Sequence, residues 1–387
     1  MAEEKKGTQG SENAQESQET KESAPETLIN AELLGKTINV ANTLAEKMNT
    51  MSGGEGKVEL HFIDFFRNVF VKHTRDEADE IFICGTAKTT PAPEDISSEW
   101  PKPWLYSRVG FVMILTYWLL YLCVVSLNSL YALAGLIVIG AFVVPVTLLI
   151  FFFEVNVPRN ISFASLLAAF FVGGTSSLFV TLILFQFFPT GGLGFLRAAM
   201  IGLIEETGKL IIVAIYIRRK KNCNYILNAM LYGAAVGAGF DAFESAGYGL
   251  VYGLMEAGSI GTVLSITNAR ALTAPGGHIV WAAITGAAIM IVKKDRELTL
   301  DIFREKAFWM IYIWPIAMHA AWDMPININI GPFSLHHIIL IVVAWIMIVV
   351  LLNRGLAEIN SMHGPIEAEI KAPEKKKKRT KKAAEGA

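Results

Sequence analysis

The sequence predicts an all-α protein, a polytopic membrane bundle of about eight transmembrane helices. Three observations predict this fold class: 53% of the 387 residues are hydrophobic, the mean hydropathy is +0.42, and apolar runs long enough to cross a bilayer recur along the chain. The runs fall at residues 105–127, 131–155, 161–188, 194–217, 225–255, 271–292, 307–326 and 333–352.

The segment before the first run has a different composition. Residues 1–27 are polar and lack an apolar core, so we expect disorder there and no signal peptide. Residues 28–100 contain amphipathic stretches that charge interrupts too often for a membrane span, which predicts a helical cytosolic region. After these two segments we expect an eight-span domain at 101–354 and a basic, disordered tail at 355–387.

Charge in the loops predicts the orientation of the bundle. The loops at 218–221 and 293–306 are rich in lysine and arginine, whereas those at 126–130 and 325–337 carry no charged residue. By the positive-inside rule, we expect both termini in the cytoplasm of a multi-pass cell-membrane protein. The basic run at 375–382 predicts attachment to anionic lipid rather than binding to nucleic acid.

The run at 194–217 contains two carboxylates and one amine within otherwise apolar sequence. An ionisable group near the bilayer centre costs about 2.5–3.5 kcal/mol on insertion scales, so Glu205, Glu206 and Lys209 need partners, water or a chemical task. Glu205 precedes Lys209 by four residues, the favourable order for an intrahelical pair, and Glu206 is three residues from the same lysine. We therefore expect one carboxylate to pair with Lys209 while the other faces a polar cavity.

Polar groups on four predicted spans share a similar depth. The four groups are Glu205, Glu244, His278 and His319. Counted from the extracytoplasmic end at about 1.5 Å per residue, three lie roughly 12 Å deep and Glu244 roughly 16 Å deep, so we expect them in one layer. Glycines on the fifth span allow the helices to approach closely. Asp323, four residues after His319, can accept from one imidazole nitrogen and fix the tautomer of that ring.

Two chemistries require such a layer. In one, a glutamate takes a proton from water that attacks a carbonyl, and the imidazoles stabilise the oxyanion. In the other, Glu244, His278 and His319 hold Zn²⁺ while a second glutamate acts as the base, although no His-Glu-x-x-His motif is present. A proton-coupled transporter and a protease-like scaffold without hydrolysis stay open as alternatives. The three scattered cysteines argue against thiol chemistry.

These motifs resemble those of the PrsW-type intramembrane proteases, which are related to the CAAX-prenyl endopeptidases and the bacteriocin-processing membrane proteases. The resemblance covers residues 193–353 and follows the family's order of motifs, each on its own predicted span. The motifs are Glu205-Glu206-x-x-Lys209, Phe240-x-x-x-Glu244, His278 in a Gly-Gly-His setting, and His319-x-x-x-Asp323. The resemblance implies an endopeptidase that cuts membrane proteins, such as anti-sigma factors, on their extracytoplasmic side.

The resemblance also implies a role for each matching residue. Glu205 corresponds to the base that activates water, while Glu206 and Lys209 shape its charge. His278 and His319 correspond to the family's essential histidines, with His319 near the oxyanion.

Three positions depart from the CAAX-type pattern. Lys209 replaces an arginine one position further on, Glu244 replaces a histidine that helps to hold the water, and Asp323 replaces an asparagine donor. An ionised Asp323 cannot donate to an oxyanion, so we expect it to orient His319. These departures favour the PrsW branch over the alternative of a CAAX-type prenyl-protein endopeptidase. Asp241 lies outside the family pattern and receives no role.

Overall fold

The computed structural model describes residues 24–188, 194–326, 328–330 and 333–384. The chain divides into two compact units, Met1–Leu44 and Ala45–Ala387. Most of the segment predicted to be disordered, residues 1–23, lies outside the described part. The division falls inside the first helix, α1 (Ala24–Met51), so its residues up to Leu44 belong to the first unit and those from Ala45 onward to the second.

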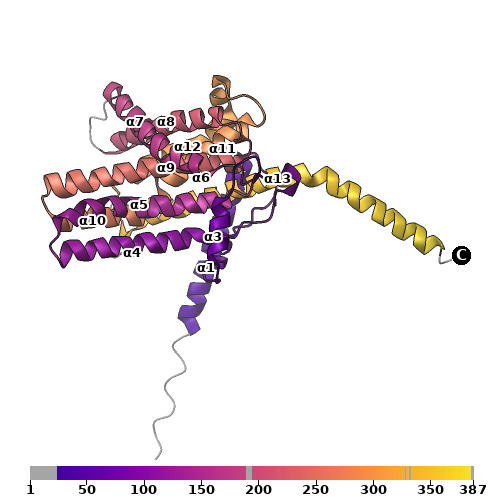
Figure 1. The fold of residues 1–387 in the computed structure, drawn as a ribbon, viewed down its shortest axis with the longest axis horizontal. Helices are drawn as coiled ribbons and strands as arrows, with labels where there is room; N and C mark the ends of the chain where they lie inside the picture. The colour runs from indigo at the N-terminus through magenta and orange to yellow at the C-terminus, as the bar shows by residue number, and fades with distance from the viewer. Residues whose placement is uncertain (1–23, 189–193, 327, 331–332, 385–387) are drawn as a thin grey trace, which may run out of the picture. The chain divides into compact units, whose positions relative to one another are not determined.

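The second unit is built almost entirely of helices, which confirms the predicted all-α class (Figure 1). In chain order its elements are α2 (Asp64–Arg67), α3 (Arg75–Phe82), η1 (Pro93–Asp95), α4 (Leu105–Val125), α5 (Leu130–Val155), α6 (Phe163–Ala168), η2 (Ala169–Gly173), α7 (Gly174–Phe187), α8 (Phe195–Arg219), α9 (Ile226–Tyr248), η3 (Gly249–Glu256), α10 (Ile260–Thr273), η4 (Ala274–Gly276), α11 (His278–Lys293), η5 (Leu300–Arg304), α12 (Lys306–Trp322), β1 (Asn329–Ile330), β2 (Phe333–Ser334) and α13 (Leu335–Ala384). The two-residue strands β1 and β2 pair antiparallel.

Six helical segments of the described chain are long and apolar enough to cross a membrane. They are Leu105–Val125, Leu130–Val155, Phe163–Phe187, Ile226–Glu256, Ile260–Lys293 and Leu335–Met362. The other two predicted spans are also helices, but α8 carries six charged residues and α12 has only 17 residues. The predicted number of eight spans is therefore not confirmed, whereas the pattern of a multi-pass bundle is.

The prediction for the sixth span is wrong about where its helix starts. The stretch 257–270 falls between the predicted spans at 225–255 and 271–292 and was therefore expected to be a loop, but it is helical from Ile260 onward as α10. That helix ends before the sequence Pro275-Gly276-Gly277, where proline removes a backbone donor and glycine breaks the helix, and α11 starts anew at His278. His278 is thus the first residue of a helix rather than a residue inside one.

The C-terminal helix also runs further than expected. α13 continues from the last span to Ala384, so the backbone is helical across most of the stretch 355–387 that we expected to be a disordered tail.

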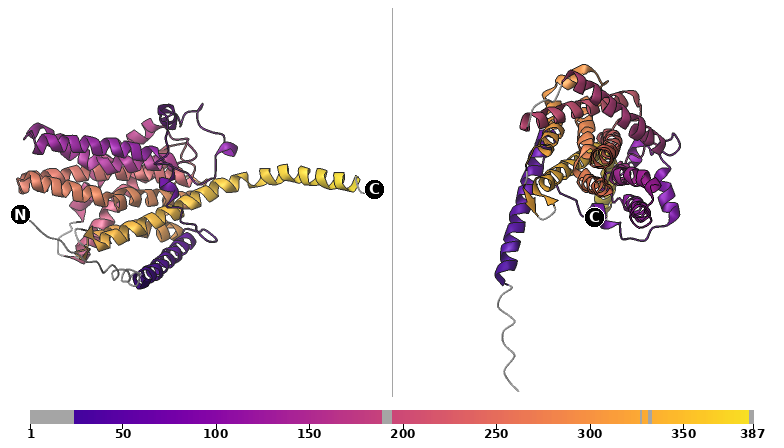
Figure 2. Two further views of the ribbon diagram at one scale, coloured as in Figure 1. Left: turned by 90° about the horizontal axis from the view of Figure 1, so that it is seen from below. Right: turned by 90° about the vertical axis from the view of Figure 1, so that its left-hand side faces the viewer.

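Helix α9 lies in the middle of the bundle, with α11 and α5 packed against it (Figure 2). Two glycines bring backbones into direct contact at the positions that matter for the cluster of polar groups. A Cβ atom at Gly237 of α9 would collide with the His278 carbonyl oxygen of α11, and one at Gly202 of α8 would lie 2.8 Å from the backbone nitrogen of Ala320 of α12. Such close approach is typical of small residues between membrane helices. It places the helix of Glu244 beside that of His278, and the helix of Glu205 beside that of His319.

Candidate active site

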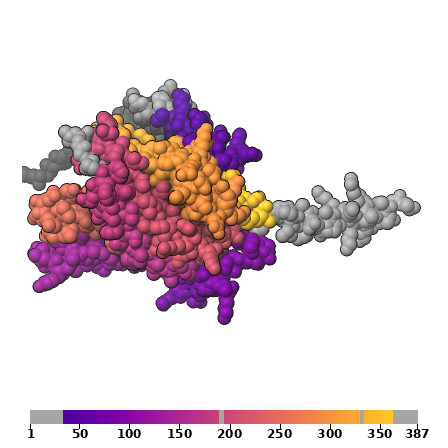
Figure 3. All heavy atoms as spheres, turned by 90° about the horizontal axis from the view of Figure 1, so that it is seen from above, coloured from indigo at the N-terminus to yellow at the C-terminus, as the bar shows by residue number. Residues whose placement is uncertain are grey.

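A cavity of about 680 Å³ lies among α7, α8, α9, α10, α11 and α12. α8 and α12 also lie next to each other at the molecular surface (Figure 3). Five of the seven predicted site residues line the cavity, and they are Glu205, Glu244, His278, His319 and Asp323. The other two, Glu206 and Lys209, are fully buried and contact the lining residues. The structure thus brings all seven predicted residues together.

Lys209 pairs with Glu206 and leaves Glu205 to the cavity. Its Nζ lies 2.7 Å from Glu206 Oε1, and both side chains are completely buried. The ammonium also lies 4.4 Å from the centroid of the Phe240 ring, a cation–π contact with α9. Glu205 Oε2 is buried and has no hydrogen-bond partner within the described structure. This is the arrangement expected from the spacing, with one carboxylate paired and the other facing the cavity.

His319 contacts Glu206 at one ring nitrogen and approaches Asp323 at the other. His319 Nδ1 lies 2.8 Å from Glu206 Oε1, and because an ionised carboxylate only accepts, the ring donates from Nδ1. In the neutral ring the lone pair is then on Nε2. Nε2 lies 3.6 Å from Glu205 Oε2 and 3.5 Å from Asp323 Oδ2. The role expected for Asp323 stays a prediction, because Asp323 contacts Nε2 while the shorter contact, at Nδ1, comes from α8, a helix that the spacing within α12 does not reveal.

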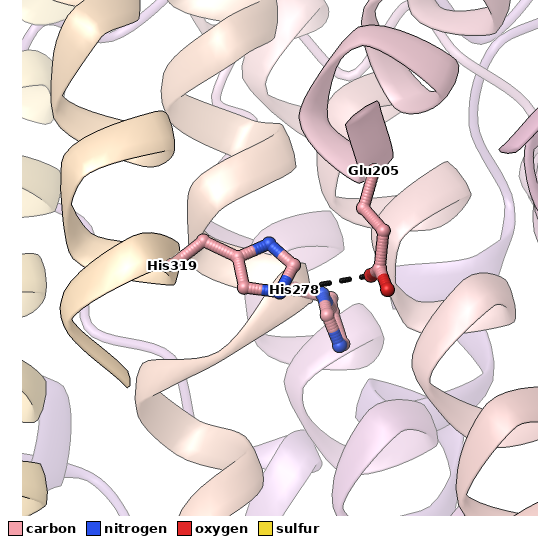
Figure 4. Close-up of side chains that lie close together, drawn as sticks. All are labelled: Glu205, His278 and His319. Atoms are coloured by element: carbon pink, nitrogen blue, oxygen red, sulfur yellow. Dashed lines mark ion pairs between the residues drawn. The ribbon is translucent and has the colours of Figure 1, made fainter. Parts of the chain in front are cut away.

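His278 is held at both ring nitrogens. Lys209 Nζ donates to Nδ1 over 2.6 Å, so the proton of the neutral ring is on Nε2, which donates to Glu244 Oε2 over 3.0 Å. The two imidazoles stand nearly perpendicular with centroids 5.0 Å apart. Glu205, His278 and His319 reach toward one another from three different helices (Figure 4). Lys209 therefore links the rings, one directly and the other through Glu206.

Arg270 belongs to this cluster and was missed by the sequence analysis. It lines the cavity, and its Nη2 lies 2.5 Å from Glu244 Oε2 and 3.5 Å from Asp241 Oδ1. Our prediction placed this arginine at the end of a loop. The available signal was the apolar sequence around it, which could have indicated a buried cation in a helix rather than a loop charge.

Among the described residues, two sets of side chains offer ligand atoms close enough to share a metal ion. The first is Glu205, His278 and His319, and the second is Asp241, Glu244 and His278, each with its ligand atoms within 4.8 Å of one another. The predicted set of Glu244 with both histidines is not one of them. In the first set, Glu205 Oε2 lacks a hydrogen-bond partner and the neutral His319 ring has its lone pair on Nε2, whereas His278 would have to release Lys209 or Glu244.

The cysteines lie outside the cavity lining. Cys84 and Cys223 are buried free thiols in loops. Burial raises the pKa of the Cys223 thiol to about 12, so that it stays protonated near neutral pH. A protonated, buried thiol is not a nucleophile.

A protein-family model matches the chain. The family model described as PrsW family intramembrane metalloprotease matches residues 128–352, more than half of the sequence and all of the elements that line the cavity. No curated protein and no solved structure matches.

Proposed function

The chain belongs to the PrsW family of intramembrane metalloproteases, and from this we propose that it is an intramembrane endopeptidase in which Glu205 activates the attacking water. The family makes it a membrane-embedded peptidase. The identity of the base, the side of the membrane and the substrate are our proposals.

The observation that carries the proposal is the state of the Glu205 carboxylate. It faces the cavity, is buried, and has an oxygen without any hydrogen-bond partner among the described residues. Leaving a buried acceptor unpaired costs about 1–3 kcal/mol, and such groups call for an explanation. A water molecule held between Glu205 and His319 Nε2 would satisfy both acceptors, and those two atoms lie 3.6 Å apart.

The surrounding contacts suit a general base. Glu205 takes a proton from the water while the water oxygen attacks the peptide carbonyl. Glu205 later gives a proton to the leaving amine. His319 accepts the second hydrogen of the water at Nε2, because its Nδ1 proton is committed to Glu206. In that tautomer His319 donates to an oxyanion only after it has taken up a proton. Lys209 neutralises Glu206, so the negative charge beside the water rests on Glu205.

The family description implies a metal ion, and the residues present fit one. Glu205, His278 and His319 would hold it, since two imidazoles and one carboxylate form a typical set of ligands for catalytic zinc. With the ion bound, Glu205 would be a ligand rather than the base, and the ion would activate the water in its place. A bound zinc ion would supply a water of lowered pKa and polarise the carbonyl. Glu206 would then accept from the other ring nitrogen of His319, a contact that commonly orients metal-bound histidines.

The substrate is proposed to be another membrane protein. Loop charges favour both termini in the cytoplasm of a cell-membrane protein, and the residue counts from the predicted span ends support a layer of polar groups in the extracytoplasmic leaflet. Single-span proteins of the anti-sigma-factor kind would meet the cavity there. The lysine-rich run at 375–382 would add attachment to anionic lipid.

The test is cleavage of a library of single-span substrates by the purified protein in liposomes. We expect Glu205→Gln to lower kcat by about 10²- to 10⁴-fold, the usual contribution of a general base. Glu256→Gln, which neutralises an exposed glutamate outside the cavity, is the matched control and should cleave at the wild-type rate. Metal analysis of the wild type, His278→Ala and His319→Ala tests the zinc assignment.

Cleavage by Glu205→Gln at the wild-type rate would show that another group is the base. Substrate-dependent proton flux without proteolysis would instead favour the transporter alternative.

A further inference from the structure

Four side chains on one face of α9 surround the guanidinium of Arg270. Besides its contacts with Glu244 and Asp241, Arg270 donates from Nε to Ser245 Oγ over 2.6 Å. The ring centroid of Tyr248 lies 4.4 Å from the guanidinium carbon. These four residues occupy positions i, i+3, i+4 and i+7, so they form a single stripe along the helix. The stripe holds one arginine from α10.

Glu244 connects this stripe to the candidate active site. Its Oε2 accepts both from Arg270 Nη2 and from His278 Nε2. Arg270 lies in α10 and His278 opens α11, so one carboxylate oxygen ties together the two sides of the break at 274–277. On the opposite edge of the ring, Lys209 donates to Nδ1. The imidazole is therefore fixed from two directions.

The contacts exceed what charge balance alone requires. Any cation near Asp241 and Glu244 would offset their charge, but here three acceptors and one aromatic ring engage the planar guanidinium. A lysine presents a point charge and cannot reproduce this forked geometry. The arginine side chain is only 24% exposed, so its orientation is set by these contacts rather than by solvent.

We propose that Arg270 is a positioning residue of the active site, which fixes the Glu244 carboxylate so that His278 is held with its proton on Nε2. Asp241 and Ser245 share this task because they fix Arg270 in turn. The proposal rests on the proposed hydrolase function and adds to it a residue that lies outside the four motifs.

The first measurement compares kcat and KM for wild type, Arg270→Gln and Arg270→Lys in the liposome cleavage assay. We expect both variants to lose about 10- to 100-fold in kcat with KM changed by less than about threefold, as for other residues that orient a catalytic group. Added methylguanidinium should restore part of the activity of Arg270→Gln, and methylammonium should not. Arg304→Gln removes an exposed arginine–aspartate pair and should behave as wild type.

The second measurement determines which ring nitrogen of His278 carries the proton, in the absence of substrate. The ¹⁵N-histidine spectrum of the full-length protein contains seven histidines, and His278→Gln identifies the resonances of interest. We expect a protonated Nε2 in the wild type and a mixture of tautomers in Arg270→Gln. Arg270→Lys retains the positive charge and serves as the second variant if Arg270→Gln does not fold.

The two measurements separate the proposals. If the wild type cleaves no substrate, the proposed function fails, and the spectra alone decide the role of Arg270. Unchanged His278 resonances in both variants would overturn the inference even if kcat fell, because Arg270 would then act through another group. Full activity of Arg270→Lys would overturn it as well.

Discussion

Helix α9 passes through two buried polar regions that differ in how completely their atoms are paired. Near its start, the Asn228 amide donates to Asn156 Oδ1 and Asn160 Oδ1, both over 2.8 Å, and its Oδ1 accepts from Asn160 and from two backbone nitrogens. Asn160 in turn exchanges hydrogen bonds with the backbone and side chain of Asn222. All of these groups are neutral. We call the four residues the asparagine cluster.

The cavity end of the same helix is charged and incompletely paired. Glu205 Oε2, Glu206 Oε2 and Asp241 Oδ2 are buried without a hydrogen-bond partner in the described structure. A buried network that is fully paired rigidifies a fold, whereas unpaired buried groups cost free energy. The asparagine cluster therefore has a structural role: its hydrogen bonds connect the loop before α6 to the loop before α9. The open acceptors beside a cavity are what a proton-transfer site requires.

The largest expected effect on stability comes from breaking the charge balance at the cavity end. Lys209→Met leaves Glu206 as a buried charge without its cation, which should cost about 3–5 kcal/mol. Thermal unfolding of the detergent-solubilised protein, followed by tryptophan fluorescence, measures the loss. The double variant with Glu206→Gln removes both charges and should recover most of the stability. A Lys209→Met variant as stable as the wild type would mean that the buried Glu206 carboxylate does not depend on Lys209.

A smaller effect is expected at the asparagine cluster, and on stability alone. Asn228→Ala leaves Asn156 and Asn160 without a donor, at a cost of about 1–3 kcal/mol. The same unfolding assay should show a lower midpoint, while cleavage per folded molecule stays at the wild-type level. Asn224→Ala truncates an exposed side chain beside it and is the matched control. If Asn228→Ala were stable but inactive, the asparagine cluster would contribute to activity, which contradicts a purely structural role.

The smallest effect is expected for the carboxylate that the spacing within α12 favoured. Asp323→Asn should change kcat/KM by no more than about tenfold, or about 1.4 kcal/mol, because Asp323 Oδ2 lies 3.5 Å from His319 Nε2 while Glu206 holds Nδ1 over 2.8 Å. Glu206→Gln, compared in the same assay, should cost more. If the two variants lose equal activity, Asp323 orients His319 after all.

Much of the site was predictable because charged residues in apolar sequence restrict where helices can pack. The carboxylates of the run at 194–217 are costly to bury without partners, and the polar groups on three other predicted spans were the candidates for such partners. Helical spacing placed Glu206 and Glu205 at three and four residues from Lys209, which predicted one pair and one free carboxylate. The all-α class followed from composition and the length of the apolar runs.

Other features depend on contacts between helices that sequence spacing does not encode. Either glutamate of α8 could have paired with Lys209, and the choice follows from what faces each one across the bundle, namely His319 beside Glu206 and the cavity beside Glu205. The stretch before His278, which lay outside the predicted spans, folds as α10, and Arg270 on this helix contacts Glu244.

By itself, the sequence determined a membrane bundle with a cluster of acids and imidazoles, because burying charge in an apolar run forces such groups together. The tertiary structure decided which carboxylate holds which imidazole and which one stays open to the cavity. The reason is that hydrogen bonds between helices act over about 3 Å, and their pairing is set by helix starts and crossings rather than by distance along the chain.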